Sequence, residues 1–193
     1  MTQDRRALRR EMRALRRSLP AAARIIAADA LAEQLLALPF APQSGAVAGY
    51  WAMDGEIPLH AWQLRLPRTV DYCLPVLHHD DCLRFARWRP GAPLATNRYG
   101  IPEPDVPESE LLRADQLAFA ALPLVAFDAR GHRLGMGGGW YDRSFAFHTA
   151  RGTPPRLVGV GFSTQRAEAI DAEPWDVPLD AVCTESETFL AIP

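Results

Sequence analysis

The sequence contains no lysine, and all 21 of its basic residues are arginine. This absence excludes a Schiff-base lysine as a covalent catalyst. It also excludes a phosphate-binding loop of the G-x-x-x-x-G-K-[ST] type, whose lysine contacts the phosphates. Any phosphate that this protein binds must therefore be held by arginine, by backbone N–H groups or by a metal ion.

Cysteine is scarce as well. Cys73, Cys82 and Cys183 are widely spaced, odd in number and without a C-x-x-C pair. This pattern argues against a disulfide framework and a structural zinc site, and it indicates a protein of the reducing cytoplasm. We expect the three cysteines to be small core residues.

Long apolar runs are absent too. The longest, residues 117–127, is about half of the ~20 residues that a membrane-spanning helix needs, so no membrane partner is expected. The N-terminus lacks the apolar core of a secretory signal. Its arginines resemble those of a mitochondrial transit peptide, but Asp4, Glu11 and the scarcity of serine argue for mature sequence.

Composition and charge indicate one globular domain that spans residues 1–193. Hydrophobic residues make up 48% of the chain and charged residues 23%, which is ordinary for such a domain. The first 24 residues carry a formal charge of +6 and the remainder −8, for a total of −2. Nucleic-acid binding by the whole chain is therefore not expected, and only the arginine-rich N-terminus is a candidate contact for an anion.

The first predicted helix covers residues 3–18 and has two distinct faces. Its apolar stripe consists of Leu8, Met12, Leu15 and Leu19. The neighbouring face carries Arg5, Arg9, Arg13 and Arg16. The spacing of the apolar residues is that of one side of an α-helix, and Pro20 separates this helix from the next.

Strands and helices alternate along the rest of the chain. Further helices are predicted at 21–38, 58–66 and 140–148. Strands are predicted at 46–52, 70–77, 83–88, 117–127, 157–162, 181–184 and 188–192. Residues 89–110, rich in proline, glycine and acids, are predicted to form a long loop or flap. The alternation predicts an α/β fold with a largely parallel sheet and helices on both faces, where ligands bind beyond the carboxyl ends of the strands.

Residues 122–145 carry the chemistry, in the order strand, charged turn, glycine cluster and helix. The glycines between Arg133 and Arg143 leave backbone N–H groups open to an anion, and the two guanidinium groups can grip phosphate oxygens. Asp142, in the first turn of the predicted helix, is placed to bind Mg²⁺ beside a phosphate. A mobile glycine turn, with Asp142 balancing the helix dipole, is the simpler alternative.

The segment R-L-G-M-G-G-G-W-Y-D-R, preceded by an apolar strand and F-D-x-x-G, resembles the signature of the 5-formyltetrahydrofolate cyclo-ligase family (5,10-methenyltetrahydrofolate synthetases). R-R-A-L-R at the start, M-D-G-E-I, R-Y-G-I-P-E-P and W-D-V-P-L-D-A-V-C-T-E resemble other family blocks in the same order. The resemblance spans nearly the whole chain. It implies a three-layer, Rossmann-like α/β domain.

The resemblance also implies a reaction. In this family, ATP and Mg²⁺ drive the cyclisation of 5-formyltetrahydrofolate to 5,10-methenyltetrahydrofolate, with release of ADP and phosphate. The formyl oxygen attacks the γ-phosphate to give an iminium phosphate, and N10 of the folate then displaces the phosphate. We therefore expect 5-formyltetrahydrofolate, with or without a polyglutamate tail, and ATP as ligands of a monomeric cytoplasmic enzyme.

Residue roles follow from the matched motifs. The implied catalytic residues are Arg133 and Asp142, and the implied magnesium ligands are Asp142 and Asp176. The implied ATP contacts are Arg5, Arg9, Arg133, Leu134, Gly135, Met136, Gly137, Gly138, Gly139, Trp140 and Tyr141. The implied folate contacts are Trp51, Glu56, Met136, Gly137 and Trp140.

Simpler alternatives exist for several of these residues. Glu56 could cap the helix that follows it, and the N-terminal arginines could form a solvated face, as we expect for Arg10 and Arg17. Asp176 could be an ordinary loop acid. The run His-His-Asp-Asp at residues 78–81 could suggest a metal site, but neighbours on a strand point in opposite directions, so a polar turn is favoured.

Two other functions remain open at this point. A nucleic-acid-binding module led by the arginine-rich helix would bind without Mg²⁺ and with steep salt dependence. A folate carrier with an inactive site would bind its ligand without turnover. The acidic remainder of the chain argues against the first, and the intact Arg133, glycine segment and Asp142 argue against the second. We also predict that residues 89–110 close over the substrate.

Overall fold

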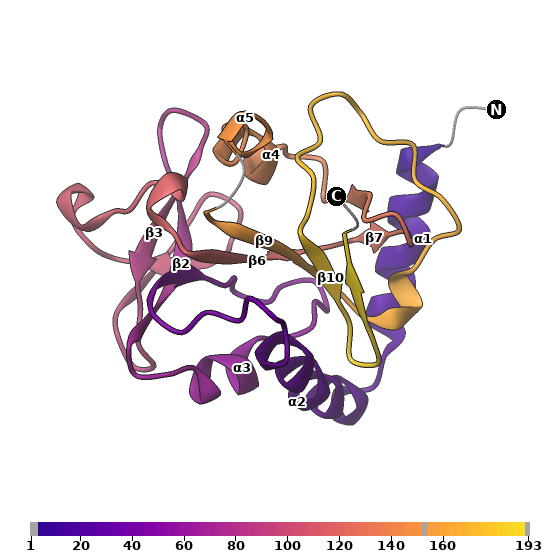
Figure 1. Cartoon of the computed structure of the whole chain (residues 1–193), viewed down its shortest axis with the longest axis horizontal. Helices are drawn as coiled ribbons and strands as arrows, with labels where there is room; N and C mark the ends of the chain where they lie inside the picture. Colours follow the sequence, from indigo (N-terminus) through magenta and orange to yellow (C-terminus); the bar gives the residue numbers. More distant parts are fainter. Residues whose placement is uncertain (1–3, 152–153, 192–193) are drawn as a thin grey trace.

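A seven-stranded sheet forms the centre of the computed structural model, which describes residues 4–151 and 154–191 (Figure 1). Its strand order is β11-β10-β9-β6-β1-β2-β3. The strands are β1 (Gly45–Ala48), β2 (Val70–Leu77), β3 (Leu83–Arg87), β6 (Phe119–Pro123), β9 (Arg156–Val160), β10 (Ala181–Cys183) and β11 (Thr188–Leu190). The edge pairs β2–β3 and β10–β11 are antiparallel, and the inner pairs are parallel. The predicted α/β fold with a largely parallel sheet is confirmed.

Helices cover both faces of this sheet. They are α1 (Arg5–Ser18), α2 (Ala21–Leu36), α3 (His60–Arg65), α4 (Trp140–Ser144) and α5 (His148–Arg151). In Figure 1, α2 and α3 lie below the sheet, α4 and α5 lie above it, and α1 lies at the right, beside β7. Along β6, Phe119 and Ala121 pack in the core with α2 and α3, whereas Ala120 and Leu122 pack in the opposite core. This alternation is expected of a strand that is buried on both faces.

The apolar run 117–127 does not form the single strand that its composition predicts. β6 ends at Pro123, and β7 (Ala126–Phe127) pairs instead with β8 (Arg133–Leu134) in a separate antiparallel pair. A proline has no N–H to donate to a sheet, so it favours the end of a strand. The break directs the chain away from the central sheet toward α1.

Residues 89–110 are also more ordered than predicted. They contain a short hairpin of β4 (Leu94–Thr96) and β5 (Pro102–Pro104), followed by the 3₁₀ turn η1 (Glu108–Glu110). At the hairpin tip, the side chain of Asn97 accepts hydrogen bonds from the N–H groups of Tyr99 and Ile101. This side-chain turn replaces the open loop and fixes the direction of the tip.

The predicted helix 140–148 is two short helices, α4 and α5. Phe145 leaves the helical region between them, and its side chain is fully buried against Phe85 at a ring distance of 5.9 Å. Tertiary packing therefore overrides the helical pattern. The strand predicted at 46–52 is shorter, because the chain leaves the sheet after Ala48. The other predicted elements are present, with small differences at their ends; residue 3 and residues 192–193 lie outside the described residues.

Two of the three cysteines are core residues, as predicted. Cys73 and Cys183 are buried, and burial raises the pKa of their thiols to about 12 and about 11. Both are therefore core residues rather than nucleophiles. Cys82 is half-buried. Within residues 4–151 and 154–191, no helix is long and apolar enough to span a membrane.

Candidate active site

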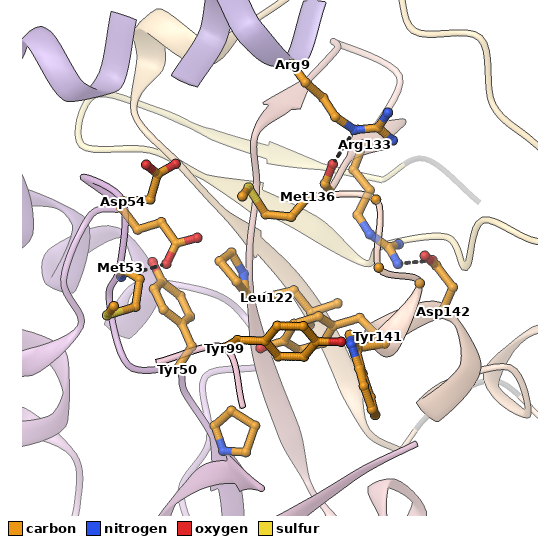
Figure 2. Close-up of a pocket in the computed structure, with 18 of the residues that line it drawn as sticks. Arg9, Tyr50, Met53, Asp54, Tyr99, Leu122, Arg133, Met136, Tyr141 and Asp142 are labelled. Atoms are coloured by element: carbon orange, nitrogen blue, oxygen red, sulfur yellow. Dashed lines mark hydrogen bonds and ion pairs between the residues drawn. The ribbon is translucent and has the colours of Figure 1, made fainter. Parts of the chain in front are cut away.

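A cavity of about 970 Å³ opens beyond the carboxyl ends of β1 and β6. Residues of the strands β2, β6 and β8 line it, together with five other parts of the chain: α1, the segment after β1, the tip of the β4–β5 hairpin, the glycine segment with α4, and the loop before β10. Figure 2 shows Arg9, Arg133 and Asp142 on one side and Tyr50, Met53 and Asp54 on the other. The cavity has this position because loops that follow parallel strands converge at one edge of the sheet.

The glycine segment, residues 135–139, forms one wall of the cavity. Gly137 and Gly139 have φ angles of +96° and +66°, which side chains rarely tolerate. Within the described part of the chain, no hydrogen bond is donated by the backbone N–H groups of residues 136–139. These donors are therefore available to a ligand in the cavity.

Arg133 lies beneath this wall and is 8% exposed. Its guanidinium donates hydrogen bonds to the carbonyl of Val177 and to the Oδ1 atom of Asp142. Burial lowers the pKa of Arg133, and the charges of Asp142 and Asp176 oppose that effect. The contacts hold a cation at the inner end of the cavity.

Two arginines of α1 reach the same wall. Arg9 Nε donates to the carbonyl of Gly135 at 2.8 Å, as the dashed line in Figure 2 marks. Arg5 forms ion pairs with Asp176 at 3.3 Å and with Glu173 at 3.4 Å. The sequence left open whether these arginines form a solvated face, and the structure places both at the cavity.

The structure corrects the predicted faces of α1. Leu15 is 41% exposed, whereas Arg16 is fully buried. Arg13, Arg16 and Arg17 all donate to the carboxylate of Asp54, which lies in the turn after β1. Arg17 is 55% exposed, in agreement with its prediction as a solvated residue, although it also pairs with Asp54. A carboxylate 38 residues away in the sequence draws Arg16 inward, and no local pattern reveals this.

We call Asp54 and its three arginines the Asp54 cluster. Burial raises the pKa of Asp54, but hydrogen bonds from the arginines outweigh that effect, and the pKa lies well below its usual range. Arg16 also donates to the backbone carbonyls of Asp54 at 2.9 Å and of Leu124 at 3.3 Å. The cluster therefore ties α1 to the turn that carries Glu56.

Glu56 lines the cavity and does not cap a helix. Its Oε2 atom accepts a hydrogen bond from the N–H of Met53 at 3.0 Å, and α3 begins only at His60, without a side-chain cap. The alternative that Glu56 caps the next helix is therefore wrong. Burial raises the pKa of Glu56, while the Met53 hydrogen bond and the nearby Arg16 lower it.

A family model described as the 5-formyltetrahydrofolate cyclo-ligase family matches residues 1–185. The chain belongs to this cyclo-ligase family. It is 36% identical over 181 residues to a 5-formyltetrahydrofolate cyclo-ligase of Haemophilus influenzae, covering 92% of this chain and 96% of the relative. An Escherichia coli protein of the same name is 36% identical over 163 residues, covering 82% and 87% of the two chains.

Solved structures agree with this assignment of the chain to the cyclo-ligase family. The solution structure of Aquifex aeolicus 5,10-methenyltetrahydrofolate synthetase matches with a TM-score of 0.82 at 28% identity, covering 99% of this chain and 94% of that one. A synthetase from Mycoplasma pneumoniae has the same fold, with a TM-score of 0.72 at 21% identity, covering 95% and 100% of the two chains.

The cyclo-ligase motif residues meet at the one cavity, although they are far apart in the sequence. The predicted site residues that line it are Arg5, Arg9, Trp51, Glu56, Arg133, Gly135, Met136, Gly137, Gly138, Gly139, Trp140, Tyr141, Asp142 and Asp176. Two predicted residues do not line it. Arg143 donates instead to the backbone carbonyls of Asp81 and Gly138. The side chain of Leu134 is fully buried in a small core with Met12 and Ile170. Any nucleotide contact of Leu134 is limited to its backbone.

Tyr99 and Trp175 line this cavity but are not among the predicted site residues. Tyr99, at the hairpin tip, approaches the ring of Trp140 at 6.3 Å, edge to face. Trp175 is 68% exposed and also lines the cavity. The motif R-Y-G-I-P-E-P includes Tyr99 and could have indicated it, whereas no sequence motif marks Trp175 as a cavity residue. Trp62, by contrast, is fully buried in the core.

Proposed function

We propose that the chain catalyses the ATP- and Mg²⁺-dependent cyclisation of 5-formyltetrahydrofolate to 5,10-methenyltetrahydrofolate, with release of ADP and phosphate. The observation that carries this proposal is the convergence of the cyclo-ligase motifs on a single cavity. The relatives bear the name of this activity. The proposed path runs through a phosphorylated formyl group, an iminium phosphate.

The chemistry requires this activation. A formamide oxygen is a poor leaving group, so ring closure at the formyl carbon needs that oxygen to be phosphorylated first. Transfer of the γ-phosphoryl group depends mainly on alignment and on stabilisation of charge at its oxygens. Arg133 and Arg9 supply cations at the glycine wall, and the free N–H groups of residues 136–139 supply neutral donors. Fixed donors of this kind stabilise the charge on the transferred phosphoryl group in the transition state.

The two sides of the cavity suit two different ligands. We assign the ATP phosphates to the side formed by Arg5, Arg9, Arg133 and the glycine segment. We assign the folate to the side formed by Trp51 and Glu56, with Met136, Gly137 and Trp140 between the two ligands. Glu56 holds a carboxylate in a largely buried position, where a hydrogen bond to the pterin amines would be strong.

Asp142 and Asp176 fit a magnesium ion held beside the phosphates. Oδ1 of Asp142 accepts from Arg133 and from the N–H of Val177, and Oδ2 of Asp176 pairs with Arg5 and accepts from the N–H of Glu173. For the other oxygen of each aspartate, the described residues form no hydrogen bond or ion pair. Mg²⁺ is commonly bound by one or two carboxylates together with substrate phosphates, and it would neutralise phosphate charge there.

An absorbance assay tests the proposal. Purified protein is mixed with 5-formyltetrahydrofolate, ATP and Mg²⁺, and the near-ultraviolet absorbance of the methenyl product is followed. Arg133→Ala and Asp142→Ala are each expected to lower kcat by at least about 100-fold. Arg130→Ala is the matched control, because Arg130 is 64% exposed and lies outside the cavity.

Three outcomes would redirect the proposal. Full activity of both site variants would keep the reaction and refute the site. No product from folded wild-type protein that still binds folate would favour a carrier. Salt-sensitive RNA binding without turnover would favour a nucleic-acid module. A monomer in the reducing cytoplasm remains our prediction for the protein's state and location.

A further inference from the structure

A cluster of two histidines and a glutamate lies at the turn between β2 and β3, outside the cavity. The rings of His78 and His79 are 3.9 Å apart between centroids. Glu108 of η1 approaches them, and the potential ligand atoms of these three residues lie within 4.8 Å of one another. We call this set the histidine cluster. The sequence argument that the two imidazoles point apart is wrong, because the two residues follow the end of β2 and are not part of a strand.

A carboxylate orients His78 within the cluster. Oδ1 of Asp80 lies 2.8 Å from Nδ1 of His78, and Asp80 is itself held by Arg84 and by the N–H of Cys82. A metal ion at Nε2 would require the imidazole proton to be on Nδ1, beside this carboxylate. Nε2 faces Oε1 of Glu108 at 3.2 Å. A carboxylate that fixes the tautomer of a ligating histidine is the usual support of a metal-binding imidazole.

The charges around the cluster favour a cation. Arg84 balances Asp80 at 2.5 Å, so the carboxylate of Glu108 remains for the two imidazoles. The two imidazole rings are tilted by 44° relative to one another. A single divalent ion between the two rings could be coordinated by both imidazoles and by the carboxylate of Glu108.

We propose that His78, His79 and Glu108 bind a divalent transition-metal ion of the Zn²⁺ class, at a site separate from the ATP and folate cavity. Two imidazoles and one carboxylate suit Zn²⁺ better than Mg²⁺ or Ca²⁺, which take oxygen ligands. The exposed position of His79 and Glu108 gives the ion a path from solvent. None of the three residues lines the cavity.

The proposed ion would join two segments that are separate in the sequence. His78 and His79 follow β2, and Glu108 follows the β4–β5 hairpin, whose tip places Tyr99 at the cavity. Glu103 of the same hairpin already accepts a hydrogen bond from the N–H of Leu77 at 3.1 Å. The ion would therefore reinforce the base of the hairpin whose tip lines the cavity.

Calorimetric titration of the metal-free full chain with Zn²⁺ tests this proposal. The wild type is expected to bind Zn²⁺ at this site in the presence of excess Mg²⁺. His79→Asn and Glu108→Gln are each expected to weaken binding by about 10-fold or more. Both side chains are exposed, so the variants are expected to fold. His60→Asn is the matched control, because His60 is an exposed histidine at the start of α3.

Two further variants identify competing sites. Cys82→Ser and Asp142→Ala are expected to keep the Zn²⁺ affinity of the wild type. Loss of binding in either of these, with normal binding in His79→Asn, would overturn the proposal in favour of a thiol site or the phosphate site. No Zn²⁺ binding by the wild type, or equal binding by His79→Asn and Glu108→Gln, would also overturn it.

Discussion

Substitution of Asp54 by asparagine is expected to destabilise the protein more than any change to a single arginine of its cluster. The carboxylate accepts from Arg13 at 2.7 Å and from Arg16 at 2.7 Å, and it also pairs with Arg17. Arg16 is fully buried. Asp54→Asn therefore leaves a buried guanidinium without its counter-charge.

The magnitude follows from which group loses its partner. Removing one member of a buried ion pair costs about 3–5 kcal/mol. The side chain of Asp54 is 17% exposed, and Arg16 keeps two backbone acceptors. We therefore expect Asp54→Asn to lower the free energy of unfolding by about 3 kcal/mol, the lower end of this range. Arg16→Met is expected to cost only about 1 kcal/mol, because Asp54 retains Arg13 and Arg17 and the methionine fills apolar space.

Urea denaturation of the single and double variants measures these differences. Arg16→Met combined with Asp54→Asn is expected to be less destabilised than the sum of the two, by about 1–2 kcal/mol. Arg10→Met, at an exposed position of the same helix, is the control and is expected to change stability by less than about 0.5 kcal/mol. Equal losses for Asp54→Asn and Arg16→Met, or additive effects, would refute the reasoning.

The pH dependence gives an independent check of the same cluster. The pKa of Asp54 is depressed in the folded protein, so its stabilising contribution is complete above the ordinary pKa of 3.8. The contribution is lost as pH falls through the folded pKa. The stability gap between wild type and Asp54→Asn is therefore expected to be constant near neutrality and to shrink below pH 3.8. A gap that widens in acid would contradict this assignment.

Three further predictions concern other parts of the molecule. Burial raises the pKa of Glu56, so the folded state holds the carboxyl proton more tightly than the unfolded state. The stability of Glu56→Gln relative to wild type, measured by denaturation, should therefore increase as pH rises from about 4 to 7. The KM of this variant for folate should also increase. Tyr99→Ala removes an edge-to-face contact with Trp140 at the cavity; steady-state kinetics should show a KM about 10-fold higher, which Tyr99→Phe restores. Gly159→Ala places a methyl group 2.7 Å from two leucine side chains, and thermal denaturation should show a loss of about 2 kcal/mol.

Local patterns predicted most of the elements. The apolar pattern of residues 70–77 predicts β2 at its observed bounds, and the pattern from residue 21 predicts the start of α2. The breaks were harder to foresee, because they depend on packing partners. β6 ends early and α4 is short because Phe145 and the strand after Pro123 find partners elsewhere in the molecule.

The site residues also divide into those that a local motif predicts and those that depend on distant contacts. Arg133 and Asp142 are nine residues apart, so a short motif was enough to indicate a phosphate-binding wall and to suggest the family. The second wall depends on contacts that no short motif contains. Arg16 meets Asp54 over 38 residues, and Tyr99 at the tip of the β4–β5 hairpin meets Trp140 of α4.

The sequence by itself determined the α/β class and the family, and it predicted a phosphate-binding role for the glycine segment, because these depend on residue type and on spacing along a continuous stretch. Only the tertiary structure decided that Arg16 is buried, that Leu15 is exposed and that His78 and His79 stand side by side with Glu108. The physical reason is the same in each case. A charged side chain is buried or exposed according to the counter-charge that meets it, and a distant segment of the fold supplies that counter-charge.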